Sequence, residues 1–136
     1  MEHNAPWAIL FNNDAFIAKQ GTLMGRHAAG SAYLRALANE GYKECAILTR
    51  NNYERQNFIN LFKSFLSDKK IDLNLLPWDR PDLSKEYGGI FLGDPQLGNH
   101  SVLRSNFGHN KYSIVGITHT TMSKGIMDFL ADIIYK

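Results

Sequence analysis

Glycine, hydroxyl and basic residues follow the first apolar segment of the chain. Residues 21–30 read Gly-Thr-Leu-Met-Gly-Arg-His-Ala-Ala-Gly, and an apolar run at residues 7–11 lies before them. A strand, a glycine-bearing loop and then a helix leave free backbone N–H groups and the positive end of a helix dipole at one edge of a sheet. Open α/β proteins bind ligands at that edge, so Gly21, Thr22 and Gly25 are candidate substrate-binding residues.

Arg26 falls in the first turn of the helix expected over residues 23–39. The helix dipole disfavours a cation at that position, so a basic residue there indicates an anionic partner. A solvated surface arginine is the alternative interpretation. The glycines also have an alternative, in which they serve only turn geometry and close packing.

A histidine between two threonines closes the last expected strand. Thr118, His119 and Thr120 belong to the segment Gly-Ile-Thr-His-Thr, which begins at Gly116. An imidazole and neighbouring hydroxyls both donate and accept hydrogen bonds near neutral pH, which suits a sugar or a phosphate ester. A structural histidine is the alternative, although the strand-end position favours a ligand contact.

Several common active-site patterns are missing from the sequence. The glycine spacing departs from G-x-G-x-x-G, and the second expected strand ends Thr-Arg-Asn without the acidic residue that binds a ribose. The histidines have no metal-ligand spacing, so no metal site is expected. Asp14 lacks the paired acids of a response-regulator receiver. No nucleophile elbow and no P-loop occurs.

The composition is that of one globular domain. The chain has 136 residues, 44% of them hydrophobic and 21% charged, and a formal net charge of +2. Its basic residues are scattered, which argues against a nucleic-acid partner. The single cysteine, Cys45, allows no internal disulfide and is expected to pack as a small hydrophobe. Without a membrane-length apolar run or a signal-peptide pattern, we expect a cytoplasmic protein, with contact to the inner membrane face as an open option.

Strands and helices are expected to alternate along the chain. Apolar runs predict strands at 7–12, 45–49, 71–77, 89–92 and 112–118, and helical periodicity predicts helices at 23–39, 52–67 and 121–135. Prolines and glycines predict loops at 78–88 and 93–111. This order indicates an α/β fold: a Rossmann-like, mostly parallel sheet with helices on both faces, in a single domain over residues 1–136.

Two of the expected helices carry further detail. Asn51 and Glu54 resemble a capping box at the start of the second helix. Gly30 lies inside the first helix, where glycine costs about 1 kcal/mol relative to alanine. That cost is understandable if the helix crosses a strand closely there.

The two strand-end motifs together resemble a known family. The stretches Leu-Met-Gly-Arg at residues 23–26 and Gly-Ile-Thr-His-Thr at residues 116–120 are similar to the N-terminal half of GT-B glycosyltransferases of the glycosyltransferase 4 group. The segment at residues 95–104 also looks like a connecting loop of that group. The resemblance covers about residues 7–135, and outside these motifs it is generic α/β patterning.

The resemblance implies a function for each motif. Such enzymes place two Rossmann-like domains across a cleft, and the N-terminal one shapes the site for a sugar or glycolipid acceptor. The loop from Gly21 to Gly25 would then line the cleft near the phosphates of a nucleotide-sugar donor. His119 would be the catalytic histidine that approaches the transferred sugar. The family implies retaining transfer without a required metal or cofactor, in cell-surface polysaccharide or glycolipid synthesis.

The chain departs from the family in lacking the donor half. The paired glutamates and the basic residues that neutralise the diphosphate leaving group have no counterpart here. We therefore expect an acceptor-side domain that is inactive alone and works with a second Rossmann-like domain. The apolar end at Lys136 fits the first half of a larger protein, and a complete small domain is the alternative. The main alternative function is that of a stand-alone, non-catalytic module that binds a phosphorylated or nucleotide ligand. A non-catalytic interaction domain that merely keeps the fold is a third hypothesis.

Overall fold

The computed structural model describes residues 6–17, 25–66, 70–117, 127–128 and 131. These residues form ten elements: β1 (Ala8–Leu10), α1 (Asn13–Phe16), α2 (Gly25–Asn39), β2 (Glu44–Leu48), α3 (Asn52–Leu66), β3 (Asp72–Leu76), the 3₁₀ helix η1 (Pro81–Tyr87), β4 (Gly89–Leu92), α4 (Leu97–Ser105) and β5 (Ser113–Gly116).

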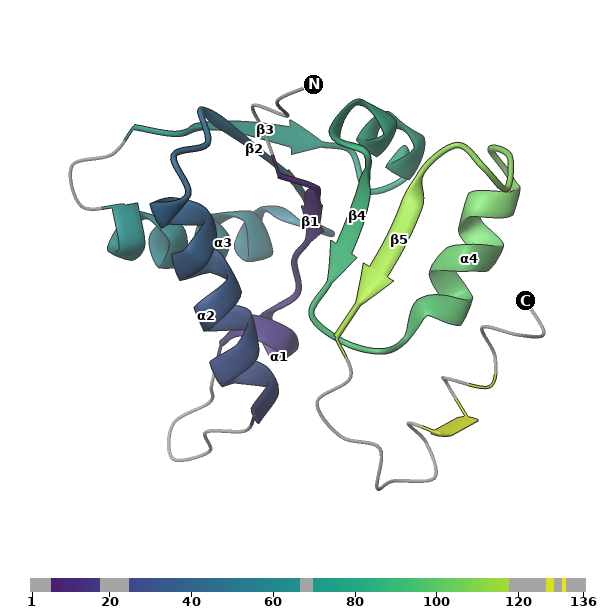
Figure 1. The fold of residues 1–136 in the computed structure, drawn as a ribbon, viewed down its shortest axis with the longest axis horizontal. Coiled ribbons are helices and arrows are strands. Elements are labelled where there is room, and N and C mark those ends of the chain that lie inside the picture. Colours follow the sequence, from purple (N-terminus) through teal and green to yellow (C-terminus); the bar gives the residue numbers. More distant parts are fainter. Residues whose placement is uncertain (1–5, 18–24, 67–69, 118–126, 129–130, 132–136) are drawn as a thin grey trace.

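All five strands are parallel and form one sheet in the order β3-β2-β1-β4-β5 (Figure 1). The chain begins in the middle of the sheet, moves outward through β2 to β3, and then returns past β1 to β4 and β5. Parallel neighbours require crossover connections, which the helices and η1 provide. The expected α/β fold with a Rossmann-like sheet is confirmed.

Alternate residues of the central strands face two separate cores. Ile9 and Ile47 pack with α1, α2 and α3 on one face of the sheet. Leu10 and Leu48 pack on the other face with Tyr87 of η1 and with α4. Because both faces are covered, the central strands are apolar or glycine at every position except Glu44, which begins β2, and this explains why their sequences read as hydrophobic runs.

The predicted strands and the first two helices are confirmed to within two residues at their ends. The helix predicted at 23–39 is described from Gly25 onward, and the one at 52–67 ends at Leu66. The helix predicted at 121–135 lies outside the described residues except at three positions, which are helical.

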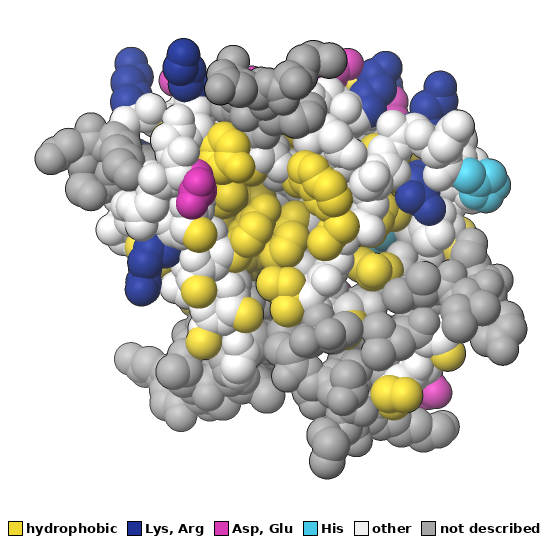
Figure 2. Space-filling model, in the orientation of Figure 1, with side chains coloured by type: hydrophobic (Ala, Val, Ile, Leu, Met, Phe, Trp, Pro, Cys, Tyr) yellow, Lys and Arg dark blue, Asp and Glu magenta, His cyan; other side chains and the backbone are white. Residues whose placement is uncertain are grey.

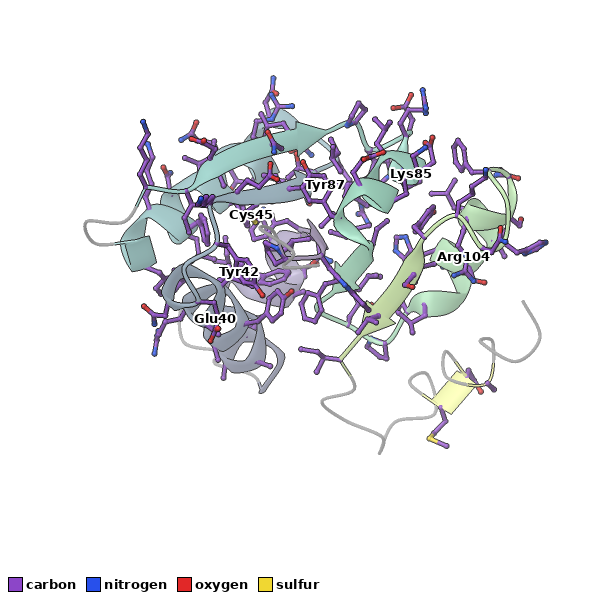
Figure 3. The ribbon with its side chains drawn as sticks, turned by 45° about the horizontal axis from the view of Figure 1, so that its top comes forward. Glu40, Tyr42, Cys45, Lys85, Tyr87 and Arg104 are labelled. Atoms are coloured by element: carbon purple, nitrogen blue, oxygen red, sulfur yellow. The ribbon has the colours of Figure 1, made fainter. Side chains whose placement is uncertain are left out.

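The loop predicted over residues 93–111 is wrong, because α4 lies within it. Glycine and proline residues in this segment predicted a loop. The helix was missed because few apolar side chains hold it to the sheet, so its sequence has little apolar periodicity. Leu97 packs against the core, whereas Val102 is 47% exposed. The Arg104 guanidinium also donates a hydrogen bond to the Tyr112 carbonyl at 3.1 Å, beside β5 (Figure 3). The predicted loop at 78–88 likewise contains η1, and α1 was not predicted.

One face of the sheet presents hydrophobic side chains next to α2. Phe91 and Val115 are register partners in β4 and β5, so they point to the same side. The Tyr33 ring of α2 stacks on Phe91 with centroids 3.7 Å apart, and Val115 remains 37% exposed. Figure 2 shows hydrophobic side chains gathered on this face between α2 and β5.

A close contact between α1 and α2 positions the loop after β1. A Cβ atom at Gly30 would lie 2.7 Å from the Ala15 carbonyl oxygen and 2.8 Å from Phe16 Cδ1, so only glycine lets the helices approach this closely. His27 is 4% exposed and its Nε2 lies 3.1 Å from the Asp14 carbonyl oxygen. The close approach at Gly30 is therefore to the helix α1, and the prediction that a strand lies there is wrong. His27 is buried against the same segment.

Replacing Gly30 with alanine is expected to destabilise the fold by about 1–3 kcal/mol, because overpacking against a backbone outweighs the gain of about 1 kcal/mol in helix propensity. The free energy of unfolding from urea titrations measures the effect. Gly25→Ala is the matched control, since nothing lies within 4 Å of a Cβ at Gly25. A Gly30→Ala variant as stable as the control would contradict the packing described.

Candidate functional site

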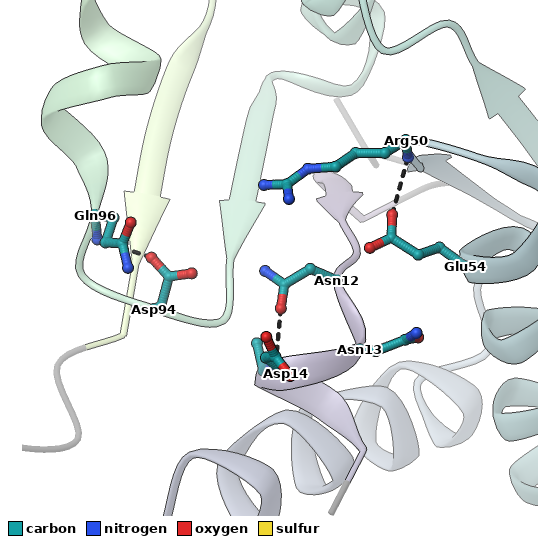
Figure 4. Close-up of a pocket in the computed structure, with 8 residues that line it drawn as sticks. Asn12, Asn13, Asp14, Arg50, Glu54, Asp94 and Gln96 are labelled. Carbon is teal, nitrogen blue, oxygen red and sulfur yellow. Dashed lines mark hydrogen bonds between the residues drawn. The ribbon is translucent and has the colours of Figure 1, made fainter.

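The carboxyl ends of β1, β2 and β4 meet around a pocket of about 440 Å³ (Figure 4). The chain leaves β1 toward β2 on one side and later fills the other side with β4, so the pocket lies at the topological switch point of the sheet. Parallel α/β sheets bind ligands at such points. We call this the polar pocket; its polar lining is Asn12, Asn13 and Asp14 after β1, Arg50 and Glu54 after β2, and Asp94 and Gln96 after β4.

The side of the polar pocket after β1 is fixed by a short capped helix. Asn12 has an extended backbone, and its Oδ1 accepts a hydrogen bond from the Ala15 N–H at 2.8 Å. This is the N-cap arrangement of α1. The neighbouring Asn13 accepts a hydrogen bond from Asn57 Nδ2 of α3 at 3.1 Å, which ties α1 to the next helix.

The side after β2 is fixed by the capping box of α3. The Glu54 N–H donates to Asn51 Oδ1 at 2.9 Å, and Glu54 Oε2 accepts from the Arg50 N–H at 3.0 Å. The predicted box is confirmed, except that the carboxylate accepts from the residue before the cap rather than from the cap itself. Because Glu54 is only 9% exposed, its carboxylate is held in one position beside the pocket.

The side after β4 depends on two glycines that allow close backbone approach. A Cβ at Gly93 would lie 3.0 Å from Ala15 Cβ, and a Cβ at Gly116 would overlap the Asp94 carbonyl oxygen. Asp94 Oδ1 accepts a hydrogen bond from the Gln96 N–H at 2.8 Å, which shapes the turn into α4. The Asp94 carboxylate is thereby held on the pocket wall opposite Arg50 (Figure 4).

The polar pocket combines three carboxylates, one guanidinium and three amides in one cavity. Carboxylate oxygens accept hydrogen bonds, the guanidinium donates them, and amide groups do both. Such a set matches a ligand with several hydroxyl groups, each of which donates and accepts. The excess of carboxylates disfavours an anion held within this pocket alone.

Arg50 also connects the polar pocket to an aromatic pair. Its guanidinium carbon lies 4.9 Å from the centroid of the Trp78 ring, and the His100 ring of α4 meets Trp78 edge-on at 6.3 Å. Burial lowers the pKa of His100 below its ordinary value; the Asp94 carboxylate raises it, and the Arg50 cation lowers it. The imidazole is therefore kept neutral at neutral pH.

Cys45 is buried in the core and has no contact with the polar pocket. Burial raises the pKa of its thiol to about 12, which keeps it protonated and unreactive. The prediction that this residue packs as a small hydrophobe is confirmed. Figure 3 labels it in β2.

Two further features were sought within the described ranges. No three His, Cys, Asp or Glu side chains there come together closely enough to hold a metal ion. None of the helices in those ranges combines the length and apolarity needed to cross a bilayer.

The residues singled out in the sequence fall mostly outside the described ranges. Gly21, Thr22, Thr118, His119 and Thr120 all lie there, so their convergence on one rim stays a prediction.

The other two candidates lie at the start of α2. Gly25 is its exposed first residue, and Arg26 occupies the first turn as predicted, although its side chain is not among those described.

Sequence reasoning missed most of the polar pocket. Asp14 was considered only for a receiver site, and Glu54 only as a helix cap. The signal that could have found the pocket is that Asn12, Arg50 and Asp94 each follow an apolar strand within two residues of its end. In a parallel sheet those ends share one edge.

Comparisons with protein-family models, with curated protein sequences and with solved structures find no match to this chain. The function is therefore argued from the polar pocket itself and from the motifs in the sequence.

His100 gives the site a pH-dependent contribution to stability. Because its folded-state pKa lies below the ordinary value of 6.5, the unfolded chain binds the proton more readily. The free energy of unfolding should fall as the pH drops below about 6.5. Urea titrations between about pH 7.5 and 5 should show a smaller fall for His100→Gln than for the unsubstituted chain. If the free energy of unfolding fell equally in the two proteins, His100 would not be the cause of the pH dependence.

Proposed function

We propose that this chain is the acceptor-side domain of a nucleotide-sugar-dependent glycosyltransferase and that the polar pocket binds hydroxyl groups of the acceptor. The observation that carries the proposal is the polar pocket at the switch point, with carboxylates and amides converging from three strand ends. Sugar hydroxyls need partners that accept and donate at fixed positions. Asp94 and Glu54 supply acceptors that are each held by a backbone hydrogen bond.

The charge of the polar pocket supports an acceptor rather than a donor. A nucleotide-sugar donor carries a diphosphate, which three nearby carboxylates would repel. The donor would therefore be bound mainly by a second Rossmann-like domain across a cleft. By resemblance, transfer would proceed with retention, without a metal or cofactor, in cell-surface polysaccharide or glycolipid synthesis. Contact with the inner membrane face would fit a glycolipid acceptor.

Binding of sugars to the chain tests the acceptor role. In ¹⁵N–¹H NMR titrations with a panel of hexoses and inositols, we expect a ligand to shift the amide signals of residues 12–14, Asp94 and Gln96. Asp94→Asn should weaken that ligand roughly tenfold or more, because a hydrogen bond to a charged group contributes about 1.5–3 kcal/mol. The amide variant retains the oxygen that accepts from Gln96, so the turn should persist.

Asp72→Asn is the matched control, since Asp72 is exposed at the opposite end of the sheet. It should leave the affinity unchanged. If no hexose or inositol shifts the pocket signals, or if both substitutions weaken binding equally, the polar pocket is not the acceptor site.

The isolated chain should not transfer sugar. Stabilising the charge of the leaving diphosphate supplies much of the catalysis in such reactions, and the described residues of the polar pocket carry one cation against three anions. We expect no product when the chain is incubated with UDP- or GDP-sugars and a binding acceptor, as followed by nucleotide release. Measured turnover would contradict the assignment to an acceptor half.

The alternative is a stand-alone binding module for a phosphorylated or nucleotide ligand. A rise in melting temperature with a mononucleotide, without any second domain, would favour it over the glycosyltransferase.

A further inference from the structure

A second cavity lies on the other side of Arg50. It measures about 490 Å³ and opens between the ends of β2 and β3 and the first turn of α3. We call it the basic cavity. Arg50 lines both this cavity and the polar pocket, so the two share a wall.

Among the residues that the structure describes, the lining of the basic cavity has two cations and no carboxylate. Arg50 and Arg55 are its charged lining residues. Arg55 Nε is buried and has no hydrogen-bond partner in the structure. A buried donor left unpaired costs free energy, and an anionic oxygen is the strongest partner that a guanidinium N–H can find.

Thr49, Asn51 and Asn52 add polar groups to the basic cavity, whereas the side formed by the end of β3 is apolar. Trp78 and Leu75 line it, and Leu75 is 43% exposed. The Arg50 guanidinium lies over the Trp78 ring, with 4.9 Å between its central carbon and the centroid, which limits the directions in which its donors can point. An anion bound between the two arginines would therefore sit beside a carbon surface, next to the polar pocket.

We propose that Arg50 and Arg55 bind a phosphate group of the same ligand whose hydroxyl groups occupy the polar pocket. This inference rests on the proposed function and assigns the acceptor to the class of phosphorylated sugars or polyols. The two positive charges of the guanidiniums balance the two negative charges of a phosphate monoester. Each planar guanidinium can also donate two parallel hydrogen bonds to the phosphate oxygens. The separation of charge between the cavities fits one ligand with a neutral hydroxylated part and an anionic part.

The test compares matched ligands on the full chain by ¹⁵N–¹H NMR. Each hexose or inositol of the panel is titrated beside its phosphate monoester, and inorganic phosphate and glucuronate are titrated alone. A phosphate monoester should bind at least tenfold more tightly than its parent compound. Inorganic phosphate should shift the signals of residues 49–55, 75–76 and Trp78 and leave the signals of residues 12–14 unchanged.

Substitutions separate the two cavities. Arg55→Met removes the charge and keeps the aliphatic stem, and it should abolish the tenfold preference for the monoester without changing the affinity of the parent compound. Arg35→Met is the matched control, because Arg35 is an exposed arginine of α2 that stacks on Phe65 and lines neither cavity. It should leave both affinities unchanged.

The outcomes distinguish this inference from the proposed function. Equal affinity for monoester and parent, an unchanged preference in Arg55→Met, or tighter binding of glucuronate than of any monoester would overturn the phosphate assignment. Phosphate shifts in the basic cavity of the unsubstituted chain, without binding of any unphosphorylated sugar, would support the anion site and overturn the acceptor pocket. The titration with inorganic phosphate uses the unsubstituted chain, so it tests the anion site even if Arg55→Met does not fold.

Discussion

The parallel pairing of β1 with both β2 and β4 is the constraint on which both cavities depend. The register sets Leu10 level with Leu48 on one side and with Leu92 on the other. Three strands therefore end together; the Phe11 N–H still donates to the Leu48 carbonyl, and the polar residues that follow lie beyond the paired positions of the sheet. Their polar groups must be satisfied by helix caps, by turns or by a ligand. The site is thus a product of the sheet edge rather than of any one motif.

Polar side chains at this edge serve the fold and the site at once. Asn12 caps α1, Glu54 completes the box at α3, and Asp94 forms the turn before α4. Each uses one oxygen for a backbone N–H, so the remaining polar atoms are held in fixed positions. A ligand that meets them loses little free energy in ordering side chains, which is the advantage of a pre-organised site.

The sequence predicted the central strands and α3 well because their patterns are strong. Phe58 and Phe62 keep helical spacing and are fully buried, and the apolar runs of β1 and β2 match strands covered on both faces. It failed at α4, where polar and small residues predominate and the helix is held by Leu97 and by the Arg104 hydrogen bond. The polar pocket was missed for a related reason. Its residues come from three separate loops, and no local sequence pattern predicts that these loops lie side by side.

The close packing around the turn that carries Asp94 limits how the specificity of the polar pocket can change. At Gly93 and Gly116 any side chain would press on a neighbouring backbone or side chain, so the turn that carries Asp94 is held close to α1 and to β5. Gln96 at the rim is exposed, and only its backbone N–H takes part in the turn. Divergent descendants of this chain would be expected to acquire new ligands by exchanging rim residues such as Gln96, while Gly93 and Gly116 stay invariant.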